Sequence, residues 1–171
     1  MFDQFDIDAA KAVSHLLHLA IAYVLALPIG WDREARARSA GVRTFPLVAV
    51  GACAYMLAGL HFLGASADAH ARVIYGIITG IGFIGGGAIL KQDDGVTGTA
   101  TAASIWSTGA IGIAVALDRL EIAILLSAVN YLTLRFGRRL KDRATHRHGL
   151  PGAEPPAGLS SAEEEHHDRP R

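Results

Sequence analysis

The sequence predicts an all-α membrane protein, built as a bundle of about five transmembrane helices with a disordered C-terminal tail. Apolar residues make up 51% of the 171-residue chain and gather in long runs that contain no Asp, Glu, Lys or Arg. Basic residues concentrate in alternate segments between these runs, and after residue 140 the chain becomes charged and poor in apolar residues. We therefore expect a transmembrane domain over residues 1–140 and a disordered polar tail over residues 141–171.

The uncharged runs cover residues 13–30, 45–63, 73–90, 100–117 and 122–134. Eighteen helical residues extend about 27 Å, close to the roughly 30 Å hydrocarbon core of a bilayer. Each run should be helical, because lipid offers no partner for unpaired backbone groups. The fifth run is the shortest, so a hairpin of the fourth and fifth runs that only dips into the membrane is the alternative.

Lysine and arginine are unevenly divided between the two sides of this predicted bundle. One side holds 11 of them: Arg33, Arg36, Arg38, Arg43, Lys91, Arg135, Arg138, Arg139, Lys141, Arg143 and Arg147. The other side holds three, Lys11, Arg72 and Arg119. Because cytoplasmic loops carry the excess of basic residues, the N-terminus should lie outside and the tail in the cytoplasm.

The first span leads into a charged segment, GWDREARARSAGVRTF, which begins at residue 30. Pro28, just before it, removes a helical hydrogen bond and favours a kink. Two pairs place an acid four residues before a base, which favours continuation of the helix. These pairs are Asp32 with Arg36 and Glu34 with Arg38. Gly41 can end the helix, and Thr44 offers an N-cap hydroxyl to the second span.

The charged segment has two interpretations. Anchoring at the cytoplasmic surface accounts for Arg36 and Arg38. It accounts less well for the acids, which contribute little to orientation and stand beside an anionic membrane surface. The kink can place Asp32 at the water boundary, in a cleft beside Arg43. The candidate functional motif is Asp32, Arg33, Glu34, Arg43 and Thr44.

Glycine dominates the third run, VIYGIITGIGFIGGGAIL. Its GIGFIG segment has the spacing of a dinucleotide-binding turn, but it lies within a run and no acid follows in residues 100–117, so nucleotide binding is not predicted. Two pairs have the four-residue spacing that allows close helix packing in lipid. They are Gly76 with Gly80 and Gly82 with Gly86. In the fourth run, Ser104, Thr108 and Gly112 share one stripe, which also favours a helix interface.

The alternative for the third run is a broken helix whose bare carbonyl groups coordinate a cation. Oxygen ligands suited to magnesium follow it at Asp93, Asp94, Thr97, Thr99 and Thr101. Against this alternative, the spans contain no carboxylate, which is the usual mark of an ion path.

Histidines gather on the outer side in the predicted topology. They are His15, His18, His61 and His70, with Asp68 nearby. A transition-metal or proton-sensing site is one interpretation, but the spacing matches no strong metal motif, so no metal site is predicted. No nucleophile, base and orienting group can be placed together, and the single cysteine, Cys53, lies alone in an apolar run. We therefore expect neither an enzyme nor a cofactor.

Three segments, GWDREARARSAGVRTFPLVAVGA, ITGIGFIGGGAIL and VTGTATAASIWSTGAIGIAVAL, in this order, resemble the MgtC/SapB family of bacterial membrane proteins. The resemblance covers roughly residues 15–135. The family's first motif falls on Gly30, Asp32, Arg33, Glu34, Gly41, Arg43 and Thr44. The glycine-rich motif falls on Gly80, Gly82, Gly85 and Gly87, and the third motif on Thr101, Ala102, Ala103, Trp106 and Gly112.

The resemblance implies a non-enzymatic protein of the bacterial inner membrane that modulates other membrane proteins, among them the proton-driven ATP synthase, under magnesium limitation or acid stress. The family includes proteins tied to survival of pathogens inside macrophages. The alternative is a small magnesium transporter or channel. The expected partners are the lipid bilayer, other integral membrane proteins or further copies of the chain, and no nucleic acid. Longer members carry an ACT-like domain after the spans, so this chain resembles the short form.

Overall fold

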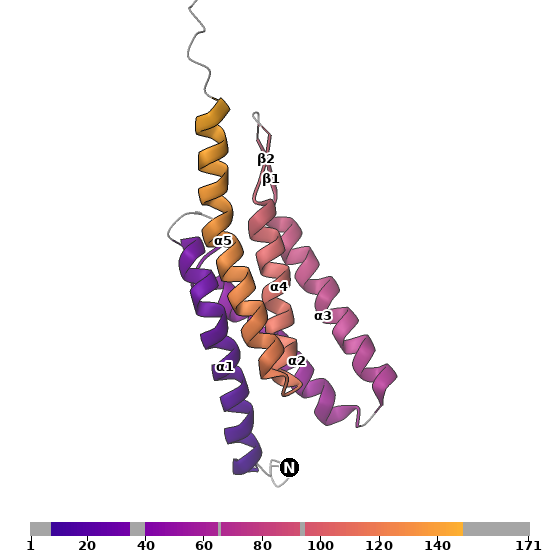
Figure 1. Ribbon diagram of the computed structural model, residues 1–171. Helices are drawn as coiled ribbons and strands as arrows, with labels where there is room; N and C mark the ends of the chain where they lie inside the picture. The colour runs from indigo at the N-terminus through magenta and orange to yellow at the C-terminus, as the bar shows by residue number, and fades with distance from the viewer. Residues whose placement is uncertain (1–7, 35–39, 65, 93–94, 149–171) are drawn as a thin grey trace, which may run out of the picture. The chain divides into compact units, whose positions relative to one another are not determined.

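The computed structural model describes residues 8–34, 40–64, 66–92 and 95–148, with secondary structure alone for 138–148. Its elements are α1 (Ala9–Glu34), α2 (Thr44–Phe62), α3 (Ala67–Gly87), β1 (Leu90–Gln92), β2 (Gly95–Thr97), α4 (Thr99–Ala116) and α5 (Leu120–His148). Residues 1–137 and 138–171 form two separate units. The predicted helical fold is confirmed, and in the first unit the helices lie side by side (Figure 1).

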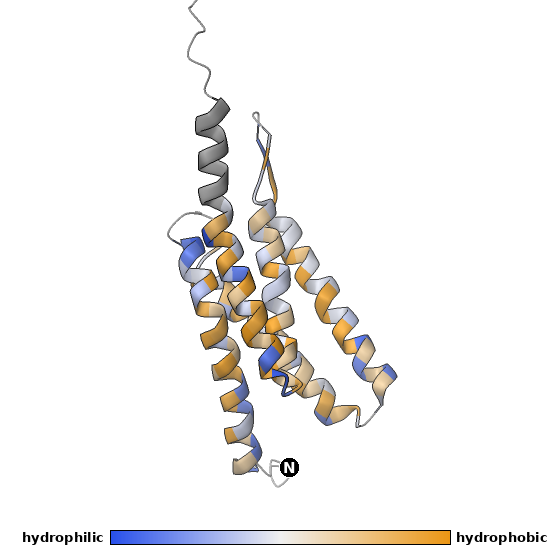
Figure 2. Cartoon of the chain, in the orientation of Figure 1, coloured by the Kyte–Doolittle hydropathy of each residue, from blue (hydrophilic) through white to orange (hydrophobic). Residues whose placement is uncertain are grey.

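Among the described helices, α1, α2, α4 and α5 are long and apolar enough to cross a membrane. The fifth predicted span meets this criterion over Leu120–Gly137, which is longer than its uncharged run. Apolar residues follow the length of these helices (Figure 2). The third span is represented by α3, which begins at Ala67 and includes Arg72. That all five helices cross the membrane stays a prediction.

Asp8 caps the first helix. Its Oδ1 accepts hydrogen bonds from the amides of Ala10 and Lys11, at 3.0 and 3.2 Å. The hydrogen bond from the Lys11 amide is the largest of the influences that lower the pKa of the Asp8 carboxyl. The charged form of this carboxyl therefore fits the start of α1, where unpaired amides and the helix dipole favour an anion.

The start of α2 differs from the prediction. The helix begins at Thr44, its N-cap is Arg43, and no side chain makes a capping hydrogen bond. The amides of Thr44 and Phe45 instead donate to the carbonyl oxygen of Gly41, at 3.0 and 3.2 Å. The predicted N-cap role of Thr44 is therefore wrong, because a tight backbone turn at Gly41 satisfies the first amides.

The central helix is α4, which contacts α1, α2 and α3 and has 11 of its 18 residues buried. Glycines bring its neighbours close. A Cβ at Gly109 would overlap Cδ1 of Ile81 on α3, and one at Gly112 would overlap the carbonyl oxygen of Ala49 on α2. From the side of α3, a Cβ at Gly85 would lie 3.1 Å from the carbonyl oxygen of Ala102. These glycines set the spacing of the bundle.

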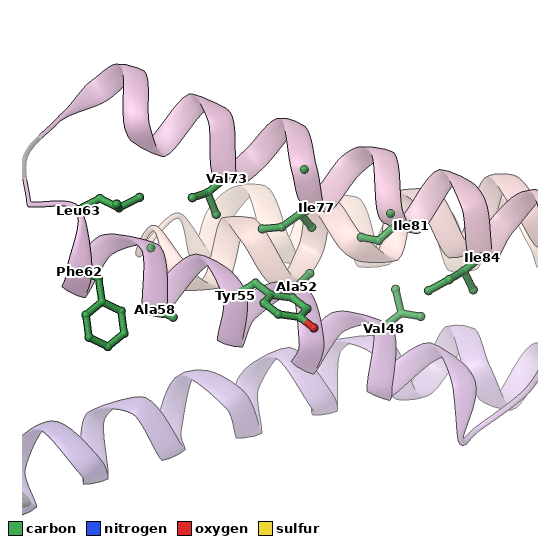
Figure 3. Close-up of a pocket in the computed structure, with 13 residues that line it drawn as sticks. Val48, Ala52, Tyr55, Ala58, Phe62, Leu63, Val73, Ile77, Ile81 and Ile84 are labelled. Atoms are coloured by element: carbon green, nitrogen blue, oxygen red, sulfur yellow. The ribbon is translucent and has the colours of Figure 1, made fainter. Parts of the chain in front are cut away.

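The paired glycines of α3 have a different position. A Cβ added at Gly76, Gly80, Gly82 or Gly86 would meet nothing within 4 Å. Gly76 and Gly80 line an apolar groove of about 660 Å³ between α2 and α3 (Figure 3). The contact between α3 and α4 uses Gly85 and Ile81 instead. Packing at the paired glycines stays a prediction.

The fifth helix buries a narrow stripe, formed by Ala123, Ser127, Asn130 and Leu134. This spacing of four, three and four residues is the seam typical of helices that pack nearly parallel. Residues 141–148, assigned to the tail from the sequence, continue this helix, and residues 149–171 lie outside the described residues.

A short antiparallel hairpin joins α3 to α4, with Leu90 opposite Thr97 and Gln92 opposite Gly95. The run 73–90 is expected to be helical throughout, but α3 ends at Gly87 and Leu90 begins β1. Gly98 follows the hairpin with φ 88°, and a Cβ there would overlap the carbonyl oxygen of Ala88. The turn therefore requires glycine for both its backbone conformation and its space.

Candidate functional site

The candidate motif lies where three segments meet at one end of the bundle: the last turn of α1, the turn at residues 41–44 and the first turn of α4 (Figure 1). A Cβ at Gly30 would lie 3.0 Å from Cα of Val42, so the end of α1 approaches the turn backbone directly. A Cβ at Gly41 would overlap Oε2 of Glu34. Gly30 therefore lets the two backbone segments approach closely, whereas a side chain at Gly41 would displace the carboxylate of Glu34.

Glu34 closes the turn onto the helix. Its Oε2 accepts a hydrogen bond from the Val42 amide at 3.1 Å, although the side chain is otherwise exposed. The Val42 amide lies before α2, so it takes no part in the backbone hydrogen bonds of that helix. Glu34 thus links the end of α1 to a backbone amide eight residues later. The charged form of its carboxylate is the better acceptor of this hydrogen bond.

Asp32 and Arg33 point into the bundle from the same turn. Asp32 is 4% exposed. Nη2 of Arg33 donates to Oγ1 of Thr101 at 2.9 Å, and Thr101 is 2% exposed. A buried charged group is costly unless it is paired or hydrogen-bonded, so this arrangement fixes the relative positions of α1 and α4. The motif therefore forms a polar contact between α1 and α4.

The remaining predicted site residues are arranged less closely. Arg43 is exposed and Thr44 half-buried. Arg36, Arg38, Asp93 and Asp94 lie outside the described residues, so the acid–base helix pairs and the acidic part of the magnesium alternative stay predictions. Thr101 is expected from the sequence only as an oxygen ligand for magnesium or as part of the family's third motif, whereas the structure makes it the partner of Arg33.

A line of buried polar groups continues from Thr101 along α4. Ser104 Oγ donates to the Ala100 carbonyl and Thr108 Oγ1 to the Ser104 carbonyl, both at 2.7 Å. From α5, Nδ2 of Asn130 donates to Oγ of Ser107 at 2.6 Å and to the Ser104 carbonyl at 3.3 Å. The hydroxyls of Ser104 and Thr108 thus bond within α4, whereas the two hydrogen bonds of Asn130 join α5 to α4.

The outer histidines do not assemble into the cluster considered from the sequence. His18 bonds to Asp118, whereas the ring of His61 packs edge-on against Phe62 with centroids 5.1 Å apart. Among the residues that the structure describes, no three side chains of the His, Cys, Asp or Glu type are placed to hold a metal ion.

The MgtC family model matches residues 19–143 of the chain. Protein MgtC of Salmonella typhimurium is 35% identical over 132 residues, which cover 75% of this chain and 56% of that protein. The "Putative magnesium transporter YhiD" of Escherichia coli is 31% identical over 134 residues, which cover 75% of this chain and 62% of that protein. The aligned part is thus less than two thirds of each relative. No solved structure matches. Because these matches cover most of its length, the chain belongs to the MgtC family.

Proposed function

We propose that this chain is a non-enzymatic, multi-pass protein of the bacterial inner membrane that modulates other integral membrane proteins under magnesium limitation or acid stress. Its N-terminus lies outside and its C-terminus in the cytoplasm, in agreement with the distribution of lysine and arginine. It acts by contact, either as a single chain or with further copies of itself. The ATP synthase is the first partner to test.

The contact of Arg33 with Thr101 is the observation that carries this proposal. The charged motif joins α1 to α4 at the end that the basic residues assign to the cytoplasm, and α4 contacts most of the bundle. A partner that binds at this end and alters the contact between Arg33 and Thr101 would therefore change the positions of several helices. Conversely, a change in the arrangement of the helices would alter the surface that a partner contacts at this end.

A magnesium transporter or channel is the second candidate. It is favoured by the name of the Escherichia coli relative and by the polar groups that continue from Thr101 along α4. The two candidates differ in what the protein does alone. A transporter moves magnesium when it is the only protein in a vesicle, whereas a modulator requires its partner.

Proton pumping by the ATP synthase tests the proposed modulation. Inverted bacterial membrane vesicles that contain the protein should take up protons more slowly on addition of ATP than vesicles that lack it. Thr101→Val keeps the side-chain volume but removes the acceptor for Arg33, so vesicles with this variant should pump at the rate of vesicles without the protein. Uptake is followed by quenching of a pH-sensitive dye.

Thr101→Ser is the matched control, because it keeps the hydroxyl acceptor and should slow pumping as the original chain does. The amount of each variant in the vesicles is measured by immunoblot. Equal rates of proton uptake with the original chain, with either variant and without the protein would contradict modulation of the ATP synthase.

A further inference from the structure

His18 makes a polar contact at the end of the bundle opposite the charged motif. Its Nε2 lies 2.9 Å from Oδ1 of Asp118, in the turn between α4 and α5, and its Nδ1 lies 2.7 Å from the carbonyl oxygen of Ser14. The His18 side chain is 19% exposed and that of Asp118 is 86% exposed. The imidazole is thus largely covered, whereas the carboxylate that bonds to it is exposed.

Both partners of the imidazole ring are acceptors. A backbone carbonyl oxygen has no proton to donate, and an ionised carboxylate has none either. Both ring nitrogens must therefore carry a proton to make the two hydrogen bonds, and this is the case only in the imidazolium form. The neutral ring can keep only one of the two contacts.

Asp118 is held at a defined place by its backbone. It has φ 55°, in the left-handed region, and its amide donates to the Val115 carbonyl at 3.1 Å. The next carbonyl, that of Arg119, accepts hydrogen bonds from the amides of Ile122 and Ala123, each at 3.1 Å, in the first turn of α5. A contact made by Asp118 therefore constrains the position of the first turn of α5.

A further polar contact attaches α5 to α1. Ser127 Oγ donates to the carbonyl oxygen of Leu25 at 2.7 Å, two turns into α5, and the buried stripe of this helix is narrow. The contact between His18 and Asp118 lies before this stripe. Loss of that contact would leave the first turn of α5 without its polar link to α1.

We propose that His18 and Asp118 form a proton-controlled clasp that holds the start of α5 against α1 when His18 is protonated and is weakened when His18 is neutral. The ligand that controls the clasp is the proton. Other charged or titratable groups nearby in the chain are Lys11 and His15 on α1 and Arg119 and Glu121 beside Asp118, and all four are exposed. Lys11 pairs with Asp8 at 3.4 Å, and Asp118 is the charged group that acts electrostatically on His18.

The sign of the effect follows from the protonated form. The clasp contributes stability at acidic pH and loses it as the pH rises through the titration of His18; free imidazole titrates near pH 6.5. The thermal unfolding midpoint of the full chain in detergent should therefore rise by about 2–4 °C more between pH 8 and pH 5.5 than that of His18→Gln. Asp118→Asn should also remove this extra rise, and asparagine tolerates the left-handed backbone.

His15→Gln is the matched control, because His15 lies one turn away and is exposed, so this variant should keep the extra rise. The double variant of His18→Gln with Asp118→Asn should be no less stable at pH 5.5 than either single variant. The same pH dependence in the original chain and His18→Gln, or independent effects of the two substitutions at pH 5.5, would overturn the proposal.

Movement of α5 can be measured directly with two spin labels. Leu17 on α1 and Leu125 on α5 are 57% and 64% exposed, and the buried Cys53 can stay in place. The distance distribution between labels at these two positions should be narrow at pH 5.5 and broader at pH 8, and broad at both pH values when His18→Gln is added. An unchanged distribution between the two pH values would also overturn the proposal.

Discussion

Substitution of Gly112 by alanine is expected to destabilise the bundle more than any other single methyl group added to α4. A Cβ at this position would overlap the carbonyl oxygen of Ala49 on α2 and lie 3.0 Å from Cβ of Ala52. Neither atom can rotate away, so α2 and α4 must separate. Overpacking of this kind typically costs about 1–3 kcal/mol in free energy of unfolding.

The matched control is Gly51→Ala on α2, where an added Cβ would meet nothing within 4 Å. Alanine is favoured over glycine in a helix interior by about 1 kcal/mol in aqueous helices, so this variant should be as stable as the original chain or slightly more stable. Thermal unfolding in detergent, followed by circular dichroism, compares the two. Equal midpoints for Gly112→Ala and Gly51→Ala would show that the close approach of α2 and α4 does not determine stability.

The second large effect is expected at Asp32. Asp32→Asn keeps the size and shape of the side chain but removes the charge of a residue that is only 4% exposed. The protein should therefore insert in normal amounts, while its function is lost because the charge balance beside Arg33 changes. In a strain that depends on this protein, growth at low magnesium should fall to that of cells lacking it.

Glu121→Gln makes the same chemical change at an exposed position in the first turn of α5 and should leave growth unchanged. Membrane fractionation and immunoblotting measure insertion. Normal growth with Asp32→Asn, or a variant absent from the membrane fraction, would count against a functional role for this carboxylate.

Much of the fold could be predicted from the sequence, because lipid requires long uncharged helices and such runs are visible without any tertiary information. The bounds of α1, α2 and α4 lie within four residues of these runs, whereas α3 begins earlier, at Ala67, and α5 extends beyond its run to His148. The hairpin at β1 and β2 was missed, since three-residue strands leave no periodic signal. Thr44 was assigned as a cap from its residue type, whereas the backbone turn at Gly41 satisfies the amides.

The site was predictable only in part. The charged segment identifies Asp32, Arg33 and Glu34, but the sequence does not indicate that Arg33 meets Thr101, because the two are 68 residues apart. The same limit applies to His18 and Asp118, which are 100 residues apart. Spacing alone also cannot decide which glycines face a neighbour. Gly109 and Gly112 meet atoms of adjacent helices, whereas Gly76 and Gly80 line an open groove.

Magnesium flux through the purified protein tests the central claim most directly. The full chain is reconstituted alone into sealed lipid vesicles that contain a magnesium-sensitive dye, and magnesium is added outside. If the protein is a modulator, magnesium should enter these vesicles no faster than it enters protein-free vesicles. This should hold for the original chain and for Asp32→Asn. Magnesium entry that requires the original chain and is abolished by Asp32→Asn would contradict the account and assign a transport function to this motif.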